Sequence, residues 1–585
     1  MSAVLEANEP SARYLSALQP KLVQHFELLG TAAGGVAKLR ELILTLAVQG
    51  KLVPQNPNDE PASELLQKIR VEKERLIAQG KLKRDKPLIE IAEVELPFEA
   101  PRGWEWVTFG VIAGIERGGS PRPIDSFLTD DPDGLNWIKI GDTDKGGKYI
   151  TSTREKIRRE GLTKTRMVYP GDFLLTNSMS FGRPYITRIE GCIHDGWLRI
   201  SPPSSLNKDY LFYLLSSQFV RNLFVAAAAG GVVLNLNADK VRNVPIPLPP
   251  LAEQSRIVTR VEELMRLCDA LEAKGQLEAV QHAQLVQTLL GALTASTSPE
   301  ELADNWQRVA THFDLLLDRP EAVDALEQTI LQLAVRGLLV PQDLTEEPAS
   351  ELLKKIHAEK DRLIADGKIK RAKSLQPVGE DEQPFVVPNG WKWVRIADLC
   401  SMVTDGEHLT PTRCYDSTQV PLVTAKNVRH ETMDYRVTDY VPLDVADKCW
   451  QRCKPEVGDI LMVSVGATLG RLCVLREPLD MVLVRSVTVL RPVHLGVLVD
   501  FFALHLMSKD SQVEIWSEVK QSAQPCLYLA KSAALKIALP PLAEQSRIVA
   551  RVKSLRLLCA DLRERLKARQ ATQAYLAEAL IDEVA

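Results

Sequence analysis

Apolar side chains recur at alternating spacings of four and three in two long stretches of this chain. The first stretch contains Ile257, Val261, Leu264, Cys268 and Leu271, and the second contains Ile548, Val552, Leu555, Cys559 and Leu562. This spacing predicts two long helices, over 251–290 and 541–583, whose apolar seams pair antiparallel in a coiled coil. A single amphipathic helix packed on its own domain is the alternative. We favour the pair because both patterns continue, toward Leu290 and Leu580.

Other regions show short β-rich runs that are separated by Gly, Pro, Asn and Asp. The predicted strands are Trp137–Ile140, Asp172–Thr176, Ile460–Ser464 and Val482–Leu490, and the predicted short helices are Leu211–Leu223 and Val499–Met507. Runs of this length and composition are typical of strands joined by turns. We interpret each region as an α+β domain with a twisted sheet.

The chain contains the same pattern twice. The eleven residues LPPLAEQSRIV occupy Leu248–Val258 and recur unchanged at Leu539–Val549. Upstream, LRELILTLAVQGKLVPQ from Leu39 matches LEQTILQLAVRGLLVPQ from Leu326, and EPASELL follows in both copies. The motif Gly-Trp-x-Trp-Val comes next, ending at Val107 and Val394. Repetition of this extent predicts two halves with one architecture.

Similarity between the halves fades over residues 110–240 and 396–535, and it returns at the Leu-Pro-Pro motif. Each half therefore has a matched frame around a divergent, domain-sized insert. Gly182-Arg183 in the first insert corresponds in sequence to Gly470-Arg471 in the second. Such a match more often marks a turn that both domains share than a site of chemistry. The predicted domains are 1–96 (helical), 97–248 (first insert), 249–383 (central helical region), 384–538 (second insert) and 539–585 (C-terminal helix).

Composition indicates a soluble globular protein. The 585 residues are 45% apolar and 25% charged, and 72 Lys and Arg against 76 Asp and Glu give a net charge of −4. This balance excludes a histone-like polybasic protein. The apolar stretch Leu223–Leu236 is too short to span a bilayer, and the first residues do not resemble a signal peptide, so we expect a cytoplasmic protein.

Motifs that carry catalysis or bind metals are missing from the sequence. There is no Gly-x-Gly-x-x-Gly, no Asp/Asn-Pro-Pro-Tyr/Phe and no His-x-x-x-His. Cys449 and Cys453 lack a second ligand pair at zinc-like spacing, so we expect the nine cysteines to be free thiols in a reducing compartment. These blanks favour a binding protein that has no catalytic residues and no metal.

Candidate binding residues lie in both inserts. Between Lys139 and Arg166, nine Lys and Arg face four Asp and Glu among Gly, Ser and Thr, which is typical of phosphate-contacting loops, although a solvated charged loop is the alternative. Arg, Lys, Asn and Gln can also read base edges. The candidates in the first insert are Lys139, Lys145, Lys148, Arg154, Lys156, Arg158, Arg159, Lys164, Arg166, Asn177, Ser178, Ser180 and Arg183. Those in the second are Lys426, Asn427, Arg429, His430, Ser464, Thr468, Arg471, Lys520 and Gln521.

Three repeated elements resemble the specificity (S) subunits of type I restriction–modification systems. They are LAVQGKLVPQ…EPASELL, the Gly-Trp-x-Trp-Val start of each insert and the PLPPLAEQ-x-R-I element. The second copy departs at Lys536-Ile-Ala-Leu-Pro-Pro, where the first has Val244-Pro-Ile-Pro-Leu-Pro-Pro. The resemblance implies two target recognition domains that each read half of a split DNA sequence, with antiparallel helices between them as a ruler.

The resemblance also implies partners. Two methyltransferase subunits would bring S-adenosylmethionine, and restriction subunits would use ATP and Mg, whereas this chain would bind no cofactor and catalyse nothing by itself. Two other readings stay open at this point. One is a methyltransferase or nuclease with an unrecognised catalytic site, and the other is a non-DNA adaptor with two ligand-binding modules on a helical spacer.

Overall fold

The computed structural model describes residues 26–584 except 33, 81–83, 85–87, 89–90, 92–95, 145, 178–180, 229–235, 372–373, 495–496 and 521–523. The chain forms two compact units, one of Met1–Glu278 with Gln570–Ala585 and the other of Ala279–Arg569. Helices α10 (Leu251–Ala295) and α20 (Leu542–Val584) contribute residues to both units. The five predicted domain boundaries stay predictions, because the division into units falls inside these helices.

The first unit joins frame helices to an insert of strands and short helices. Its frame helices are α3 (Phe26–Thr31), α4 (Gly35–Val48) and α5 (Ala62–Ala78). The strands are β1 (Glu105–Thr108), β2 (Gly114–Arg117), β3 (Leu128–Thr129), β4 (Leu135–Ile138), β5 (Tyr149–Ile150), β6 (Glu155–Ile157), β7 (Arg166–Val168), β8 (Phe173–Thr176), β9 (Pro184–Thr187), β10 (Gly191–Ile193), β11 (Trp197–Ser201) and β12 (Pro245–Leu248). The helices of the insert are α6 (Phe109–Ile112), η3 (Ile124–Ser126), η4 (Ile140–Asp142), η5 (Arg159–Lys164), α7 (Lys208–Ser216), α8 (Gln218–Ala228) and α9 (Ala238–Arg242).

The second unit repeats this plan. Its frame helices are α11 (Pro299–Thr311), α12 (Phe313–Leu316), α13 (Pro320–Val335) and α14 (Ala349–Ala365). The strands are β13 (Lys392–Arg395), β14 (Cys400–Asp405), β15 (Val420–Val423), β16 (Asp439–Val441), β17 (Ile460–Val463), β18 (Leu472–Val474), β19 (Val482–Leu483), β20 (Val487–Pro492) and β21 (Lys536–Leu539). The remaining helices are η6 (Glu380–Glu382), α15 (Ile396–Leu399), α16 (Leu443–Trp450), α17 (Val499–Met507), α18 (Lys509–Ser517) and α19 (Leu529–Ala534).

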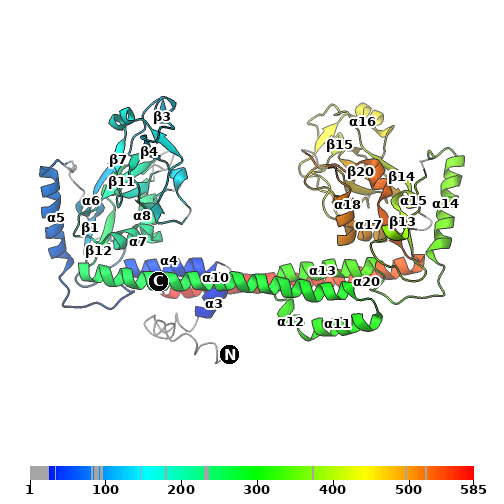
Figure 1. Cartoon of the computed structure of the whole chain (residues 1–585), viewed down its shortest axis with the longest axis horizontal. Coiled ribbons are helices and arrows are strands. Elements are labelled where there is room, and N and C mark those ends of the chain that lie inside the picture. Colours follow the sequence, from blue (N-terminus) through cyan, green and yellow to red (C-terminus); the bar gives the residue numbers. More distant parts are fainter. Residues whose placement is uncertain are drawn as a thin grey trace. The chain divides into compact units, whose positions relative to one another are not determined.

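Both inserts share a core of strands in the same order. In the first, β2-β11-β8-β9 follow one another across a sheet, and in the second, β14-β20-β17-β18 do the same. A second sheet pairs β4 with β6 antiparallel and with β10 parallel, as β15 pairs with β16 and β19. Each insert is closed where it meets the frame, because β1 pairs with β12 and β13 pairs with β21. Figure 1 shows the sheets of each insert standing on the helices of its own unit. The predicted α+β class is confirmed.

Two predicted elements are each divided in the structure. The helix expected over Leu211–Leu223 breaks at Ser217, whose hydroxyl accepts a hydrogen bond from the Val220 amide and so caps α8. The strand expected over Val482–Leu490 is two strands, β19 and β20. The break between them lets the Arg485 amide donate to the carbonyl of Glu407 in the neighbouring loop (3.0 Å).

The apolar seams of the long helices are buried within each unit. Ile257 and Val261, near the start of α10, share a core with Ala577, near the end of α20. In the other unit, Leu290 of α10 shares a core with Ile548 of α20. The start of one helix thus packs with the end of the other in each unit, which is the predicted antiparallel order. Frame helices α4 and α13 also pack into these cores, so the seams belong to helical bundles.

The repeated motifs of the sequence meet at a buried glutamate. In the first unit, the Glu253 carboxylate accepts hydrogen bonds from the Trp104 indole (2.9 Å) and the Gln55 amide (2.8 Å). In the second unit, Glu544 accepts from Trp391 (2.9 Å) and Gln342 (2.7 Å). Both glutamates are 1% exposed, and burial raises the pKa of each carboxyl. The start of the long helix, the start of the insert and the frame loop are therefore joined at one point.

The two frames also carry ion pairs of opposite polarity at matching positions. Arg40 of α4 pairs with Asp269 (2.6 Å) and Glu272 (3.1 Å) of α10. At the position that matches Arg40, α13 has Glu327, which pairs with Arg556 (3.1 Å) and Arg563 (2.8 Å) of α20. Exchanging the frame helices between the long helices would place like charges together. The reversal therefore specifies that α4 pairs with α10 and α13 with α20.

We expect Arg40→Glu to lower the free energy of unfolding by about 1 kcal/mol, because the new carboxylate faces Asp269 and Glu272 at a partly exposed site. The triple variant Arg40→Glu, Asp269→Arg and Glu272→Arg restores attraction and should recover most of the loss. Urea unfolding at low and high salt measures both changes. An equal loss in the single and triple variants would contradict the charge argument.

One difference between the halves is a matched pair of substitutions in the core. His505 is fully buried in α17, and its Nε2 accepts a hydrogen bond from the Ala538 amide (3.0 Å). The corresponding residues of the first half are Leu214 and Pro247, and proline has no amide hydrogen to donate. The histidine therefore satisfies a donor that exists only in the second copy. Burial lowers the pKa of His505 to about 3.

His505→Leu should lower the free energy of unfolding by about 1–3 kcal/mol, because it leaves the Ala538 amide buried without an acceptor. Adding Ala538→Pro removes the donor and should restore most of that loss. The double variant should also resist acid. The unfolded chain binds a proton on this histidine near pH 6.5 and the native histidine binds one only near pH 3, so we expect His505 to contribute a loss of about 2 kcal/mol of stability from pH 7 to pH 5. Urea titrations of the wild type and of the single and double variants at both pH values test this. If the losses in free energy of unfolding simply add in the double variant, the proposed coupling is refuted.

Among the described helices, none is by itself long and apolar enough to cross a membrane. Helices α7 and α8 reach the required length and apolar composition only when they are taken together, and they are bent by 65° with respect to each other.

Candidate nucleic-acid interface

Four loops meet at one edge of each insert. We call them loop face 1, which comprises residues 118–122, 139–144, 146–147, 177, 181–182 and 194–196, and loop face 2, which comprises residues 405–410, 424–430, 464–470 and 484–486 together with Arg452, which bonds Asp405. Each of these loops begins where a strand or bridge of the insert ends. Corresponding loops hold corresponding places, because the strands from which they start belong to the core that both inserts share.

Main-chain hydrogen bonds hold the loops of loop face 1 together. The Asn177 amide donates to the Gly196 carbonyl (3.0 Å), and the Gly119 amide donates to the Ile193 carbonyl (3.3 Å). The Ile140 amide donates to Nε2 of His194 (3.1 Å). Burial lowers the pKa of His194, which favours the neutral ring that this bond requires.

Loop face 2 uses the same scheme with other side chains. The Ser464 amide donates to the Ser486 carbonyl (2.9 Å), and the Glu407 amide donates to the Leu483 carbonyl (2.7 Å). The Ala425 amide donates to the Ser486 hydroxyl (3.3 Å), where loop face 1 uses a histidine ring. Both faces need a glycine in the first loop. A Cβ on Gly118 or Gly406 would lie 2.2 or 2.1 Å from a carbonyl oxygen of the loop beside it.

Three predicted binding residues support loops from inside. Asn427 is fully buried, and its amide group bonds Thr424, Asp434, Val437 and Thr438. Asp142 makes the equivalent turn in the first insert by accepting from the Lys139 amide (2.8 Å). Asn177 and Ser464 are each 2% exposed. Their polar groups are therefore turned inward, and the expectation that these side chains meet DNA stays a prediction.

Several predicted cations are engaged within the protein. Lys139 pairs with Glu155 (2.5 Å), Arg166 with Glu116 (2.9 Å), and Lys156 donates to the Pro132 carbonyl (2.8 Å). Lys148 pairs with Asp209 of α7 (2.6 Å) and lies over the rings of Phe212 and Tyr213. Lys148 is thus a link between the strands and α7, and the expectation that it contacts phosphate stays a prediction.

Other predicted cations of the first insert are exposed. Arg154, Arg158, Arg159 and Lys164 lie at the surface, and none of them has a carboxylate partner among the described residues. Lys164 lies over the Phe127 ring, 5.4 Å from its centre. Gly119 packs against the Lys164 carbonyl, so this cationic segment borders loop face 1. It is the part of the insert whose charges best suit a polyanion.

The predicted residues of the second insert are spread more widely. Lys426 is exposed and pairs with Asp439 (3.4 Å), and Arg429 pairs with Asp434 (3.4 Å). Hydrogen bonds from Arg436 hold the pKa of the Asp434 carboxyl well below its usual range. His430 and Lys520 are exposed, and Arg183, Thr468 and Arg471 are half-buried. Lys145, Ser178, Ser180 and Gln521 lie outside the described residues.

The sequence did not point to a set of fixed polar side chains on the loop faces. In the first, Asp195 accepts from the Ser120 hydroxyl (2.7 Å) and from Arg122 (3.5 Å), and the serine bond lowers the pKa of the carboxyl. In the second, Asp405 bonds Arg452 and, at 2.8 Å, His408. The Gly-Gly-Ser-Pro and Asp-Gly turns were visible in the sequence. Their partners lie 75 and 47 residues away, beyond any local signal.

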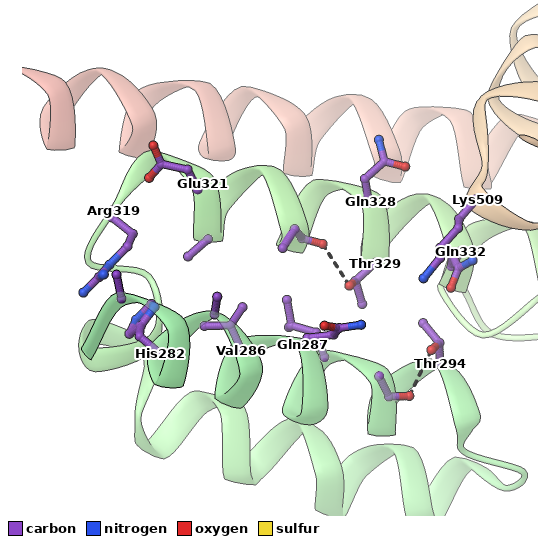
Figure 2. A pocket seen from close by; sticks show the side chains of 16 residues that line it. His282, Val286, Gln287, Thr294, Arg319, Glu321, Gln328, Thr329, Gln332 and Lys509 are labelled. Carbon is purple, nitrogen blue, oxygen red and sulfur yellow. Dashed lines mark hydrogen bonds between the residues drawn. The ribbon is translucent and has the colours of Figure 1, made fainter. Parts of the chain in front are cut away.

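A cavity of about 840 Å³ lies in the second unit between α10 and α13 (Figure 2). Its Thr294 and Thr329 hydroxyls donate to carbonyls of their own helices, at 2.9 and 3.0 Å. Arg319 at its rim pairs with Asp318 (2.6 Å). Within the described ranges no cluster of three His, Cys, Asp or Glu suits a metal ion.

Comparison with known proteins assigns the family. The family described as "Type I restriction modification DNA specificity domain" matches residues 101–282 and again 388–569. The chain belongs to this family. Each match begins just before β1 or β13 and ends within a long helix, so it contains one insert and part of the frame.

Two relatives support the assignment over nearly the whole chain. The EcoEI specificity subunit of Escherichia coli is 35% identical over 578 residues, which cover 94% of this chain and 93% of that protein. The EcoAI specificity subunit, also from Escherichia coli, is 35% identical over 572 residues with the same coverage. A chain from a solved structure of a type I R-M system is 19% identical, with 83% of this chain and 99% of that chain covered and a TM-score of 0.43. The resemblance inferred from the motifs is confirmed.

Proposed function

We propose that this specificity subunit reads a two-part duplex DNA sequence, one half with each loop face. The observation that carries the proposal is the contrast between the two faces. The same backbone hydrogen bonds build both, yet the side chains displayed on them differ, as Ser120 and Arg122 do from His408 and Arg452. A constant scaffold with different displayed donors is what recognition of two different half-sites requires.

Phosphate contacts would come from side chains that border the faces. The exposed arginines and lysine of residues 154–164 suit contacts that hold the duplex without reading it. Arg183 and Arg471 occupy matching positions, and both follow a glycine in the third loop of their face. A residue common to both inserts fits a contact that is independent of sequence.

The same proposal supplies the partners. Two methyltransferase subunits and restriction subunits would carry S-adenosylmethionine, ATP and Mg, and this chain would hold none of these cofactors. The naming of the EcoEI and EcoAI relatives as subunits of restriction enzymes supports this. Because α10 and α20 each run through both units, they would set the spacing between the half-sites. Action on genomic DNA implies a cytoplasmic location.

Exchanging inserts tests this function. We expect replacement of residues 109–244 by the corresponding insert of the EcoEI subunit to change one half of the methylated sequence, because β1 and β12 close the insert on the frame. The reciprocal control exchanges residues 396–535 and should change the other half. Single-molecule sequencing of methylated adenines reads both outcomes. If both halves change together in either chimera, the modular reading fails.

Arg158→Ala should weaken binding to all duplexes alike and lower the salt slope of log affinity by about one, without changing thermal stability. Lys148→Ala is the matched control. It leaves Asp209 unpaired beneath the sheet, so it should lower stability and leave the salt slope unchanged. Filter binding over a salt series, with thermal unfolding alongside, separates the two. If Lys148→Ala also lowers the salt dependence of log affinity, the lysine contacts phosphate.

A further inference from the structure

The fixed polar group of loop face 2 consists of Asp405, Arg452 and His408. Asp405 ends β14 with its side chain 11% exposed, whereas Arg452 is 37% exposed and His408 54% exposed. A buried carboxylate therefore holds two side chains that remain open to solvent. Hydrogen bonds to a charged acceptor are among the stronger ones in proteins, so both are held in place before any ligand arrives.

The Nε and Nη2 atoms of Arg452 hold its guanidinium group in place. Its Nε donates to the main-chain carbonyls of Asp405 (3.2 Å) and Gly406 (3.0 Å), and its Nη2 bonds the Asp405 carboxylate. Its Nη1 has no partner among the described residues and is the nitrogen left for a ligand. An arginine used only as a diffuse charge does not need three internal bonds.

His408 is fixed in a similar way. Its Nε2 lies 2.8 Å from Asp405 and 3.1 Å from Arg452. Nδ1 of the ring has no partner in the part of the chain that the structure describes. The two side chains thus present one ring nitrogen and one guanidinium nitrogen next to each other on loop face 2.

Loop face 1 carries a different group at the matching place. There the carboxylate is Asp195, from the loop after β10, and it holds Ser120 and Arg122 of the first loop. Arg183 and Arg471, by contrast, are the same residue in both inserts. Positions that differ between two otherwise equivalent faces are the ones able to distinguish two sequences.

We propose that Arg452 and His408, held by Asp405, read one base pair in the half-site recognised by the second insert, and that Arg452 selects guanine there. Among the described residues the Nη1 group of Arg452 is a free donor, and it complements the O6 or N7 acceptor of guanine in the major groove. Asp405 acts through the other two and is a positioning residue. The inference rests on the proposed function and names the side chains that carry out part of it.

The test uses the full chain in complex with its methyltransferase subunits and a pool of duplexes randomised over the second half-site. Arg452→Ala should reduce binding to the normal site by about 5- to 100-fold and abolish the preference for guanine at one position. Arg452→Lys keeps the charge but not the planar donor group, so it should keep the salt slope and still lose the preference. His408→Ala, a change at a side chain that is more than half exposed, should relax the same position.

Two further variants complete the design. Asp405→Asn should relax the same position, because Arg452 and His408 lose their common anchor. Arg476→Ala is the matched control. It removes an arginine that is ion-paired with Asp500 in the same insert but outside loop face 2, and it should change neither affinity nor preference. Thermal unfolding checks that each variant is folded, and the preferences at the first half-site should stay unchanged throughout.

Uniform weakening by Arg452→Ala, with a lower salt slope and an intact preference, would overturn the proposal in favour of a phosphate contact. Unchanged binding in folded Arg452→Ala and His408→Ala would also overturn it. A wild-type complex that selects no two-part sequence would refute the proposed function, and this inference with it. If the wild-type complex does select a two-part sequence and the Arg452 and His408 variants show the same preferences as the wild type, only the inference is refuted.

Discussion

The buried carboxylates of Glu253 and Glu544 are the constraint on which each half is built. A charged group at 1% exposure is unfavourable unless donors surround it, and here an indole and an amide from two other segments supply them. Hydrogen bonds to a charged acceptor contribute about 1.5–3 kcal/mol each. The glutamate therefore fixes, at one point, where the long helix begins, where the insert begins and how the frame loop approaches both.

Neighbouring repeated residues serve the same junction. Gly50 has φ +68°, and a Cβ there would lie 2.5 Å from Pro101 and 3.0 Å from the Trp104 ring. Gly337 packs in the same way against Pro388 and Trp391. The glutamine after each glutamate ties the helix to the insert, as Gln254 accepts from the Asn207 amide at the start of α7 (3.1 Å). Once both ends of the insert are held there, the loops at its far edge can change without disturbing the frame.

Periodicity and repetition in the sequence predicted the long helices and the duplicated architecture, but not the loop faces. Helix α10 was expected over 251–290 and extends over Leu251–Ala295, because heptad spacing is a local property. The loop faces were not predicted, because their contacts join residues that are far apart in the chain. Asn427 shows the difficulty. It has the chemistry of a base reader, yet the same amide can close a turn, and only its burial tells the two roles apart.

A duplicated chain must also keep its two copies from substituting for each other. The reversed ion pairs of Arg40 and Glu327 act at the surface, where each pair contributes little energy but a wrong pairing would repel. In the core, His505 accepts from the Ala538 amide in the second half, whereas the first half has Leu214 and Pro247, which has no amide hydrogen, so a single residue exchanged between the halves would break the match. We infer that divergence at these positions disfavours alternative pairings of helices and strands. The differences in the frames and cores are thus assigned to folding, whereas the proposed function assigns the differences between the loop faces to recognition.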